Sequence, residues 1–239
     1  KWQYMREPSP PSQSFRQLFE WRHIDTVLLD MDGTLLDLYF DNFFWRTHLP
    51  RRYAEMRGLS EDEALLWLQK RFAEEHGKLN WYCLDFWQQE LGMDIVALKR
   101  EVSHLIAMRP HSAQFLDALA AAGKSIWLVT NAHMDSVTLK LEHTPLAQWL
   151  DKIVSSHQLG AAKESQAFWR ALHALHPFDA RRTLFVDDTV TVLGAARDYG
   201  IQHVLCIAHP DSSEPVREVM DFPAVTDFDQ ILPIQTVER

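Results

Sequence analysis

Short apolar runs that end in polar residues recur along this chain. They cover residues 24–30, 125–131, 152–156, 183–188 and 203–208. Apolar positions are nearly continuous within each run, whereas a strand with one solvated face alternates apolar and polar positions. The pattern is therefore typical of strands covered on both faces, and it predicts a mainly parallel sheet.

Segments with helical periodicity separate the later runs. They lie at residues 115–119, 168–175 and 190–199. Gly123 follows the first segment and Pro177 follows the second, and both residue types commonly end helices. This alternation of strand and helix predicts an α/β fold with a doubly wound, Rossmann-like sheet.

The first two apolar runs are too far apart for a simple crossover. One hundred residues separate Asp30 from Thr130, whereas a β–α–β unit needs roughly 30. Helical signals fill the interval: a capping box begins at Ser60, and Asp94 precedes a second amphipathic segment. The sequence thus predicts an all-helical subdomain inserted into the α/β core.

The expected domain organisation follows from these patterns. The α/β core comprises residues 23–37 and 109–239, and residues 38–108 form the helical cap. Residues 1–22 contain a Pro/Ser cluster and show no clean period, so we expect an N-terminal extension there.

Composition narrows the class of protein. The 239 residues are 46% hydrophobic and 24% charged, which excludes a disordered, collagen-like or coiled-coil chain. A formal charge of −9 without a dense Lys/Arg block argues against nucleic-acid and anionic-membrane partners. No apolar run approaches the roughly 18 residues of a membrane span. We expect a cytoplasmic protein of the size of an enzyme, and its oligomeric state stays open.

The spacing of the cysteines and histidines indicates neither a disulfide nor a zinc site. Cys83 and Cys206 are far apart and form no CxxC motif, so we expect reduced packing residues. None of the 12 histidines shows HxxxH or HExxH spacing, which argues against zinc.

The strongest chemical pattern follows the first apolar run. Asp30 and Asp32 alternate with Met31, and Gly33 comes next. Two carboxylates at positions i and i+2 converge where the backbone turns sharply, and glycine permits such a turn. Asp and Gly are also ordinary turn formers, so this motif alone does not establish a site.

Polar residues also follow the other predicted strands. Thr130 and Asn131 end the second run, Lys163 follows the third, and Asp187 and Asp188 end the fourth. Ligands bind beyond the carboxyl ends of strands in this architecture. Clustered carboxylates repel one another unless a cation neutralises them, so the set suits Mg²⁺ and a phosphate group.

These motifs, in this order, resemble those of the haloacid dehalogenase superfamily. Asp30 to Thr34 resemble the first motif, Thr130 the second, Lys163 the third and Asp187–Asp188 the fourth. The helical insertion after the first motif resembles the family's first type of cap. Ala162 stands where a proline often precedes the lysine in relatives.

The resemblance implies a Mg²⁺-dependent phosphomonoester hydrolase. Asp30 would attack phosphorus and form an aspartyl-phosphate, and Asp32 would act as general acid and base. The Asp30 carboxylate, the Asp32 main-chain carbonyl and Asp188 would hold Mg²⁺. Asp187 would be a further ligand or a neighbour of the ligands.

The same resemblance implies a phosphate-binding set. Thr130 and Lys163 would contact phosphoryl oxygens, with Lys163 also neutralising Asp30. The peptide N–H groups of Met31 and Asn131 are further donor candidates.

Residues of the predicted cap indicate what kind of leaving group the substrate carries. Aromatic residues concentrate between Trp81 and Trp87, next to Asn80, and their flat apolar surface suits a nucleobase. Phrases such as residues 79–85, 130–133 and 140–144 resemble those of bacterial GMP/IMP 5′-nucleotidases of this superfamily. The candidate substrate contacts are Asn42, Asn80, Trp81, Tyr82 and Arg109. For Asn42 and Arg109, a place on the surface or at the hinge between cap and core is an equal alternative.

Alternative functions remain on the same scaffold. A sugar-phosphate or phosphoglycolate phosphatase or a phosphomutase would use the same motifs. A dehalogenase needs no second acid, so Asp32 argues against it. A non-catalytic binding protein that retains the fold is disfavoured because every motif side chain is present.

Overall fold

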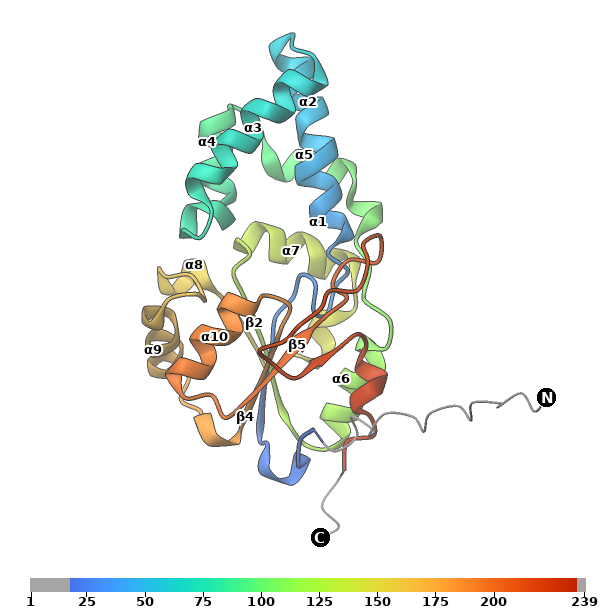
Figure 1. Ribbon diagram of the computed structural model, residues 1–239, viewed down its shortest axis with the longest axis vertical. Coiled ribbons are helices and arrows are strands. Elements are labelled where there is room, and N and C mark those ends of the chain that lie inside the picture. The colour runs from blue at the N-terminus through green and yellow to red at the C-terminus, as the bar shows by residue number, and fades with distance from the viewer. Residues whose placement is uncertain (1–17, 236–239) are drawn as a thin grey trace, which may run out of the picture.

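A parallel sheet forms the centre of the computed structural model, which describes residues 18–235 (Figure 1). Its strand order is β3-β2-β1-β4-β5-β6, and every adjacent pair is parallel. The strands are β1 (Thr26–Leu29), β2 (Ser125–Thr130), β3 (Lys152–Ser155), β4 (Thr183–Asp187), β5 (His203–Ile207) and β6 (Ala224–Val225). The predicted doubly wound fold is confirmed. Only the two-residue β6 was not predicted, because it is too short to show a pattern.

Both faces of this sheet are buried, which explains the continuous apolar runs. Val27 and Leu29 of β1 belong to one core cluster, whereas Leu28 between them belongs to the cluster on the other face. Helices α6 (Ser112–Ala121) and α7 (Met134–His143) contribute to the first cluster, and α9 (Gln166–Leu175) and α10 (Val190–Tyr199) to the second.

The strand register brings the polar strand ends to one edge. Leu29 pairs with Leu128 of β2 and with Val186 of β4. The Asp30 N–H then donates to the Val186 carbonyl at 3.0 Å. Residues that follow β1, β2 and β4 therefore lie side by side at the carboxyl edge of the sheet.

A helical cap stands over that edge (Figure 1). It contains α1 (Tyr39–Phe43), α2 (Leu49–Arg57), α3 (Glu61–Glu75), α4 (Leu84–Leu91) and α5 (Ile95–Glu101), with a π-helical turn at Phe44–His48 and a 3₁₀ turn at Leu79–Tyr82. The capping box at Ser60 and the cap at Asp94 both form. The cap has its own apolar core, in which Phe44, Leu68 and Trp87 are fully buried.

The predicted N-terminal extension ends earlier than residue 22. Residues 1–17 lie outside the described part of the chain, but Trp21 is 3% exposed and packs against Phe115 of α6. Burial of this large ring makes it part of the α/β core, so the core begins before residue 23.

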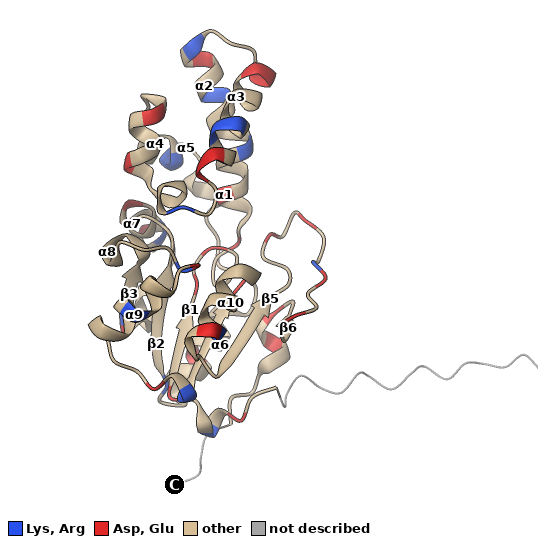
Figure 2. Ribbon diagram, turned by 60° about the vertical axis from the view of Figure 1, so that its left-hand side comes forward, with Lys and Arg blue, Asp and Glu red and all other residues tan. Residues whose placement is uncertain are grey.

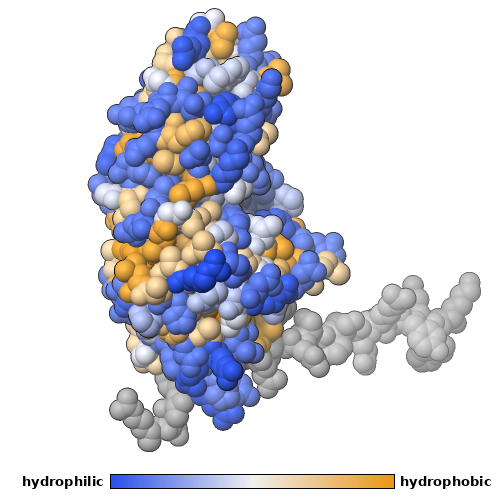
Figure 3. Space-filling view, turned by 90° about the vertical axis from the view of Figure 1, so that its left-hand side faces the viewer, coloured by the Kyte–Doolittle hydropathy of each residue, from blue (hydrophilic) through white to orange (hydrophobic). Residues whose placement is uncertain are grey.

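The surface carries both signs of charge. Figure 2 shows acidic and basic residues interspersed on the cap helices. Figure 3 shows one face of the molecule, which is mainly hydrophilic and carries apolar patches. Within residues 18–235, no helix combines the length and apolarity needed to cross a bilayer.

Candidate active site

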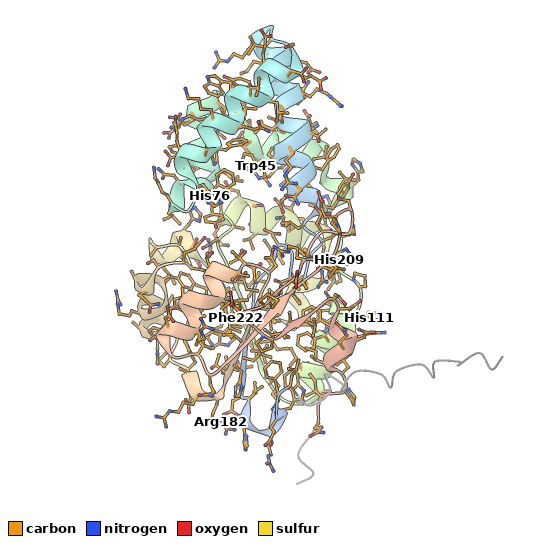
Figure 4. The ribbon with its side chains drawn as sticks, in the orientation of Figure 1. Trp45, His76, His111, Arg182, His209 and Phe222 are labelled. Atoms are coloured by element: carbon orange, nitrogen blue, oxygen red, sulfur yellow. The ribbon has the colours of Figure 1, made fainter. Side chains whose placement is uncertain are left out.

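A cavity of about 330 Å³ lies between the cap and the carboxyl edge of the sheet. Its volume is at the lower end of the range of about 300–1,000 Å³ that is typical of small-molecule sites. The core contributes mainly polar residues, namely Asp30, Asp32, Thr130, Asn131, Lys163, Asp187 and Asp188. The cap contributes Leu38, Asp41, Asn42, Trp45, His76, Trp81, Tyr82, Leu84, Trp87 and Lys99. Figure 4 places Trp45 and His76 on the side of the cap that faces the core.

The turn after β1 depends on Gly33. Its φ of +84° lies in the left-handed region, which an L-residue with a Cβ adopts at a cost. A Cβ at this position would lie 2.8 Å from Asp188 Cγ and 2.9 Å from Pro210 Cβ. The turn that orients Asp30 and Asp32 is thus packed directly against the fourth motif.

We expect Gly33→Ala to destabilise the fold by about 2–4 kcal/mol, because the left-handed strain adds to the overlap with Asp188. Activity should fall with it, since Asp188 must shift. Gly58→Ala is the matched control: φ is +65° there, but nothing lies within 4 Å of the added Cβ. Chemical denaturation of both variants compares the two losses, and equal losses would contradict the close packing at Gly33.

Lys163 connects the motifs at the base of the cavity. Its Nζ donates to Asp30 Oδ1 at 2.6 Å, to Asp187 Oδ2 at 2.7 Å and to the Val129 carbonyl at 3.1 Å. Its backbone N–H donates to Asn131 Oδ1 at 2.9 Å. The lysine side chain is 3% exposed. Burial alone would lower its pKa, but the Asp187 and Asp30 carboxylates outweigh burial and raise the pKa.

The carboxylates around Lys163 carry more negative charge than this one lysine neutralises. Burial raises the pKa of Asp30 well above its usual value. Burial and the neighbouring Asp187 raise the pKa of Asp188 to about 7. Arg217 donates to Asp188 Oδ2 at 3.2 Å from the rim. The three aspartates are buried, and each has an oxygen within 4.8 Å of the others. This all-oxygen donor set fits a hard divalent cation such as Mg²⁺.

Thr130 and Asn131 line the cavity beside Lys163. Thr130 is 2% exposed, and its hydroxyl accepts the Ala132 N–H at 3.0 Å. Asn131 Nδ2 donates to Glu164 Oε2 at 3.0 Å, and the Tyr82 hydroxyl of the cap donates to Glu164 Oε1 at 2.6 Å. Glu164 thus connects the cap to the second motif, a role that nothing in the sequence indicates.

Asp32 faces a second charged group. Lys140 Nζ of α7 donates to Asp32 Oδ1 at 2.6 Å and to Asp41 Oδ2 of the cap at 2.6 Å. Lys99 Nζ donates to Asp41 Oδ1 at 2.8 Å. None of these three partners was predicted. One signal was available for Lys99, because it stands four residues after Ile95 and so shares the apolar face of α5.

The predicted substrate contacts divide into two groups. Asn42, Trp81 and Tyr82 line the cavity, and the Asn42 amide donates to Asp211 Oδ2 at 2.6 Å. Asn80 is exposed and does not line the cavity, because its amide donates to a Glu75 carboxylate outside it.

Trp87 is also among the residues that line the cavity. It is fully buried in the cap core and donates its indole N–H to the Trp81 carbonyl at 2.9 Å. Within the segment from Trp81 to Trp87, the aromatic lining of the cavity therefore consists of Trp81, Tyr82 and the fully buried Trp87. Figure 4 shows that Trp45 and His76, from other parts of the cap, lie on the same side.

Arg109 does not reach the cavity. It is 5% exposed, and its guanidinium donates to the backbone carbonyls of Thr34, His209 and Thr226 at 2.7–3.3 Å. The substrate contact predicted for Arg109 is therefore wrong in this structure. The residue ties the return from the cap to the core, and its donors are used on carbonyl groups.

The fold and the cavity define a capped α/β enzyme whose chemistry centres on carboxylates. The family model for haloacid dehalogenase-like hydrolases matches residues 24–200. The chain belongs to this family, as its ordered motifs predict.

Individual relatives agree with this assignment. The chain is 40% identical over 213 residues to "GMP/IMP nucleotidase YrfG" of Escherichia coli strain K12, covering 89% of this chain and 96% of the relative. The Shigella flexneri protein of the same name matches equally well.

Solved structures share the fold. A HAD phosphatase from Thermococcus onnurineus superposes with a TM-score of 0.70 at 18% identity, covering 84% of this chain and 93% of that one. The putative HAD-hydrolase YfnB from Bacillus subtilis gives 0.58 at 17% identity, covering 87% and 96%.

Proposed function

We propose that this protein is a Mg²⁺-dependent phosphomonoesterase, and specifically a 5′-nucleotidase for purine monophosphates such as GMP and IMP. The observation that carries the chemistry is the buried Lys163 ammonium, 2.6 Å from Asp30 at the base of a cavity closed by the cap. The purine preference rests on the 40% identity to a GMP/IMP nucleotidase over most of both chains.

The proposed reaction has two displacements at phosphorus. A carboxylate oxygen of Asp30 attacks in line, an O–P bond to the enzyme forms and the ester O–P bond breaks. Asp32 donates its proton to the leaving alkoxide and then removes a proton from water. That water attacks the aspartyl-phosphate, which releases inorganic phosphate and restores Asp30.

Phosphate binding is assigned to the groups beside Asp30. The Thr130 hydroxyl and the N–H groups of Met31 and Asn131 would donate to phosphoryl oxygens. Lys163 reduces the repulsion between the Asp30 carboxylate and the phosphate dianion.

Mg²⁺ would be held by Asp30, Asp188 and the Asp32 main-chain carbonyl. When bound, it supplies positive charge that offsets repulsion between nucleophile and phosphate. Asp187 accepts hydrogen bonds from Lys163 and from the Thr189 N–H, so we assign it to holding Lys163 and not to the metal.

Cap residues would receive the nucleoside. Trp45, His76, Trp81 and Tyr82 line the cavity on the cap side, and aromatic rings stack on planar bases. A sugar phosphate offers no planar group to this surface, and for that reason we favour a nucleotide over the alternatives on the same scaffold.

A panel of phosphate esters tests the substrate preference. We expect kcat/KM for GMP and IMP to exceed that for phosphoglycolate and hexose phosphates by roughly 10²-fold or more, since lost base contacts weaken transition-state binding. Steady-state phosphate release with saturating Mg²⁺ gives the ratios. The reverse order would contradict the purine assignment while leaving the phosphatase assignment in place.

A further inference from the structure

Helix α7 joins the two parts of the molecule. Figure 1 shows it between the cap helices and the strands. Val137 packs in the core cluster below the helix, and Leu139 packs in the cap cluster above it; both are fully buried. Lys140 follows directly and is 1% exposed. A lysine so placed needs a paired negative charge, because burying an isolated ammonium is costly.

The charged partners of Lys140 form a chain of alternating sign. Lys140 stands between Asp32 and Asp41 at 2.6 Å from each, and Lys99 pairs with the second oxygen of Asp41 at 2.8 Å. Asp32 and Lys140 belong to the core, whereas Asp41 lies on α1 and Lys99 on α5 of the cap. Two carboxylates and two ammonium groups leave no net charge when all four are ionised.

The cap end of this row of charges, at Lys99 and Asp41, is held by several close contacts. Lys99 Nζ lies 4.7–5.5 Å from the ring centres of Phe40, Phe44 and Trp45. These distances are within cation–π range, and the lysine is 1% exposed. Asp41 receives one hydrogen bond from each lysine, so both of its oxygens are fixed.

The core end of the chain leaves one atom of Asp32 available. Oδ1 accepts from Lys140, while Oδ2 receives no hydrogen bond from residues 18–235. Asp32 lines the cavity, and its side chain is 20% exposed. Oδ2 is thus the atom left to carry a proton toward a leaving group.

We infer that Lys140 and Asp41 are positioning residues for Asp32: Lys140 orients the carboxyl group of the acid, and Asp41 brings Lys140 into place from the cap. The inference rests on the function proposed above. This arrangement couples proton donation by Asp32 to the position of the cap, because two of the four charged groups, Asp41 and Lys99, belong to the cap. The enzyme therefore presents an aligned acid only when the cap sits against the core.

Leaving-group chemistry tests the inference. A nucleoside 5′-monophosphate has an alkoxide leaving group that must be protonated, whereas p-nitrophenyl phosphate releases a stable phenolate. We expect Asp41→Asn to lower kcat for GMP by roughly 10²-fold and for p-nitrophenyl phosphate by less than about threefold, given that general acids contribute roughly 10²–10⁴-fold. Lys140→Gln should show the same split.

The chain offers a matched control for cap docking. Arg100 of α5 and Glu142 of α7 form an exposed ion pair at 2.8 Å, between the two helices that carry Lys99 and Lys140. Glu142→Gln breaks a cap–core ion pair without touching Asp32, so it should leave the ratio of the two esters unchanged. A purely structural role for Asp41 would make Asp41→Asn behave like this control.

Folding is checked by circular dichroism and thermal melting. If Lys140→Gln fails to fold, Asp41→Asn decides the question. The double variant Asp41→Asn/Lys99→Gln removes one charge of each sign, so the two remaining groups, Asp32 and Lys140, still balance each other. Equal losses on both esters in the folded variants overturn the inference, as does a split in Glu142→Gln. Failure of the proposed function is distinct: without phosphatase activity the unmodified enzyme would hydrolyse neither ester, and without purine specificity it would hydrolyse p-nitrophenyl phosphate but GMP poorly.

Discussion

Asp30→Asn should abolish turnover while the protein stays folded. The amide is nearly isosteric with the carboxylate but is no nucleophile, and losing an enzyme's nucleophile costs roughly 10⁴-fold or more in kcat. Stability should hold or rise. Burial raises the pKa of Asp30, so the folded state disfavours its charged form, and a neutral amide removes that penalty. Phosphate release and thermal melting measure the two effects.

The matched control lies just before the same strand. Asp25 precedes β1 at its amino end and forms an exposed pair with Arg182. Asp25→Asn is the same chemical change about one strand length away, and it should retain full activity. Trapping labelled phosphoenzyme from the unmodified protein, but not from Asp30→Asn, would support the covalent step. Normal turnover in Asp30→Asn would refute the assignment of the nucleophile.

Removing divalent cations should stop phosphate release, and Mg²⁺ should restore it. Without a cation the buried carboxylates of Asp30, Asp187 and Asp188 face one another with Lys163 as their one fully buried positive partner among the described residues. Mg²⁺ should also raise Tm, because a ligand at 100 times its Kd adds about 2.7 kcal/mol to the free energy of unfolding. Thermal melting measures this stabilisation by Mg²⁺ without any catalytic assay.

Asp188→Asn should remove most of that Tm shift. A second acidic group supplies the control: Asp85, His133 and Asp135 also lie within metal-binding distance of one another, but both acids there are exposed. Asp135→Asn should therefore leave the Mg²⁺ shift intact. A shift that survives in Asp188→Asn but disappears in Asp135→Asn would move the cation site away from the strand ends.

Local patterns were sufficient for much of the fold and for the motif residues. The apolar run before Asp30 forms β1 because both of its faces are covered, and the box at Ser60 begins a helix because its side chain satisfies a free N–H. Lys163 was assigned through its place in an ordered motif set, although it lies 133 residues from Asp30. The domain boundaries themselves stay predictions, apart from the earlier start of the core at Trp21.

The cap side of the site was less predictable, because side-chain direction depends on packing. Asn80 lies in the expected aromatic segment, yet its amide turns to Glu75. The Trp87 ring lines the cavity but is fully buried in the cap core. Arg109 has the charge to bind a phosphate ester, but nearby carbonyl groups use its donors. Residue type and spacing say nothing of such competition.

The sequence by itself determined the strand and helix pattern, the inserted cap, and the carboxylates and lysine that follow the strands. Each of these depends on neighbouring residues or on one ordered motif set. The tertiary structure decided which buried charges meet. Lys140 lies 108 residues from Asp32 and 99 from Asp41, and no local pattern links them. They pair because α7 packs against both core and cap, and a buried charge is stable only beside its partner.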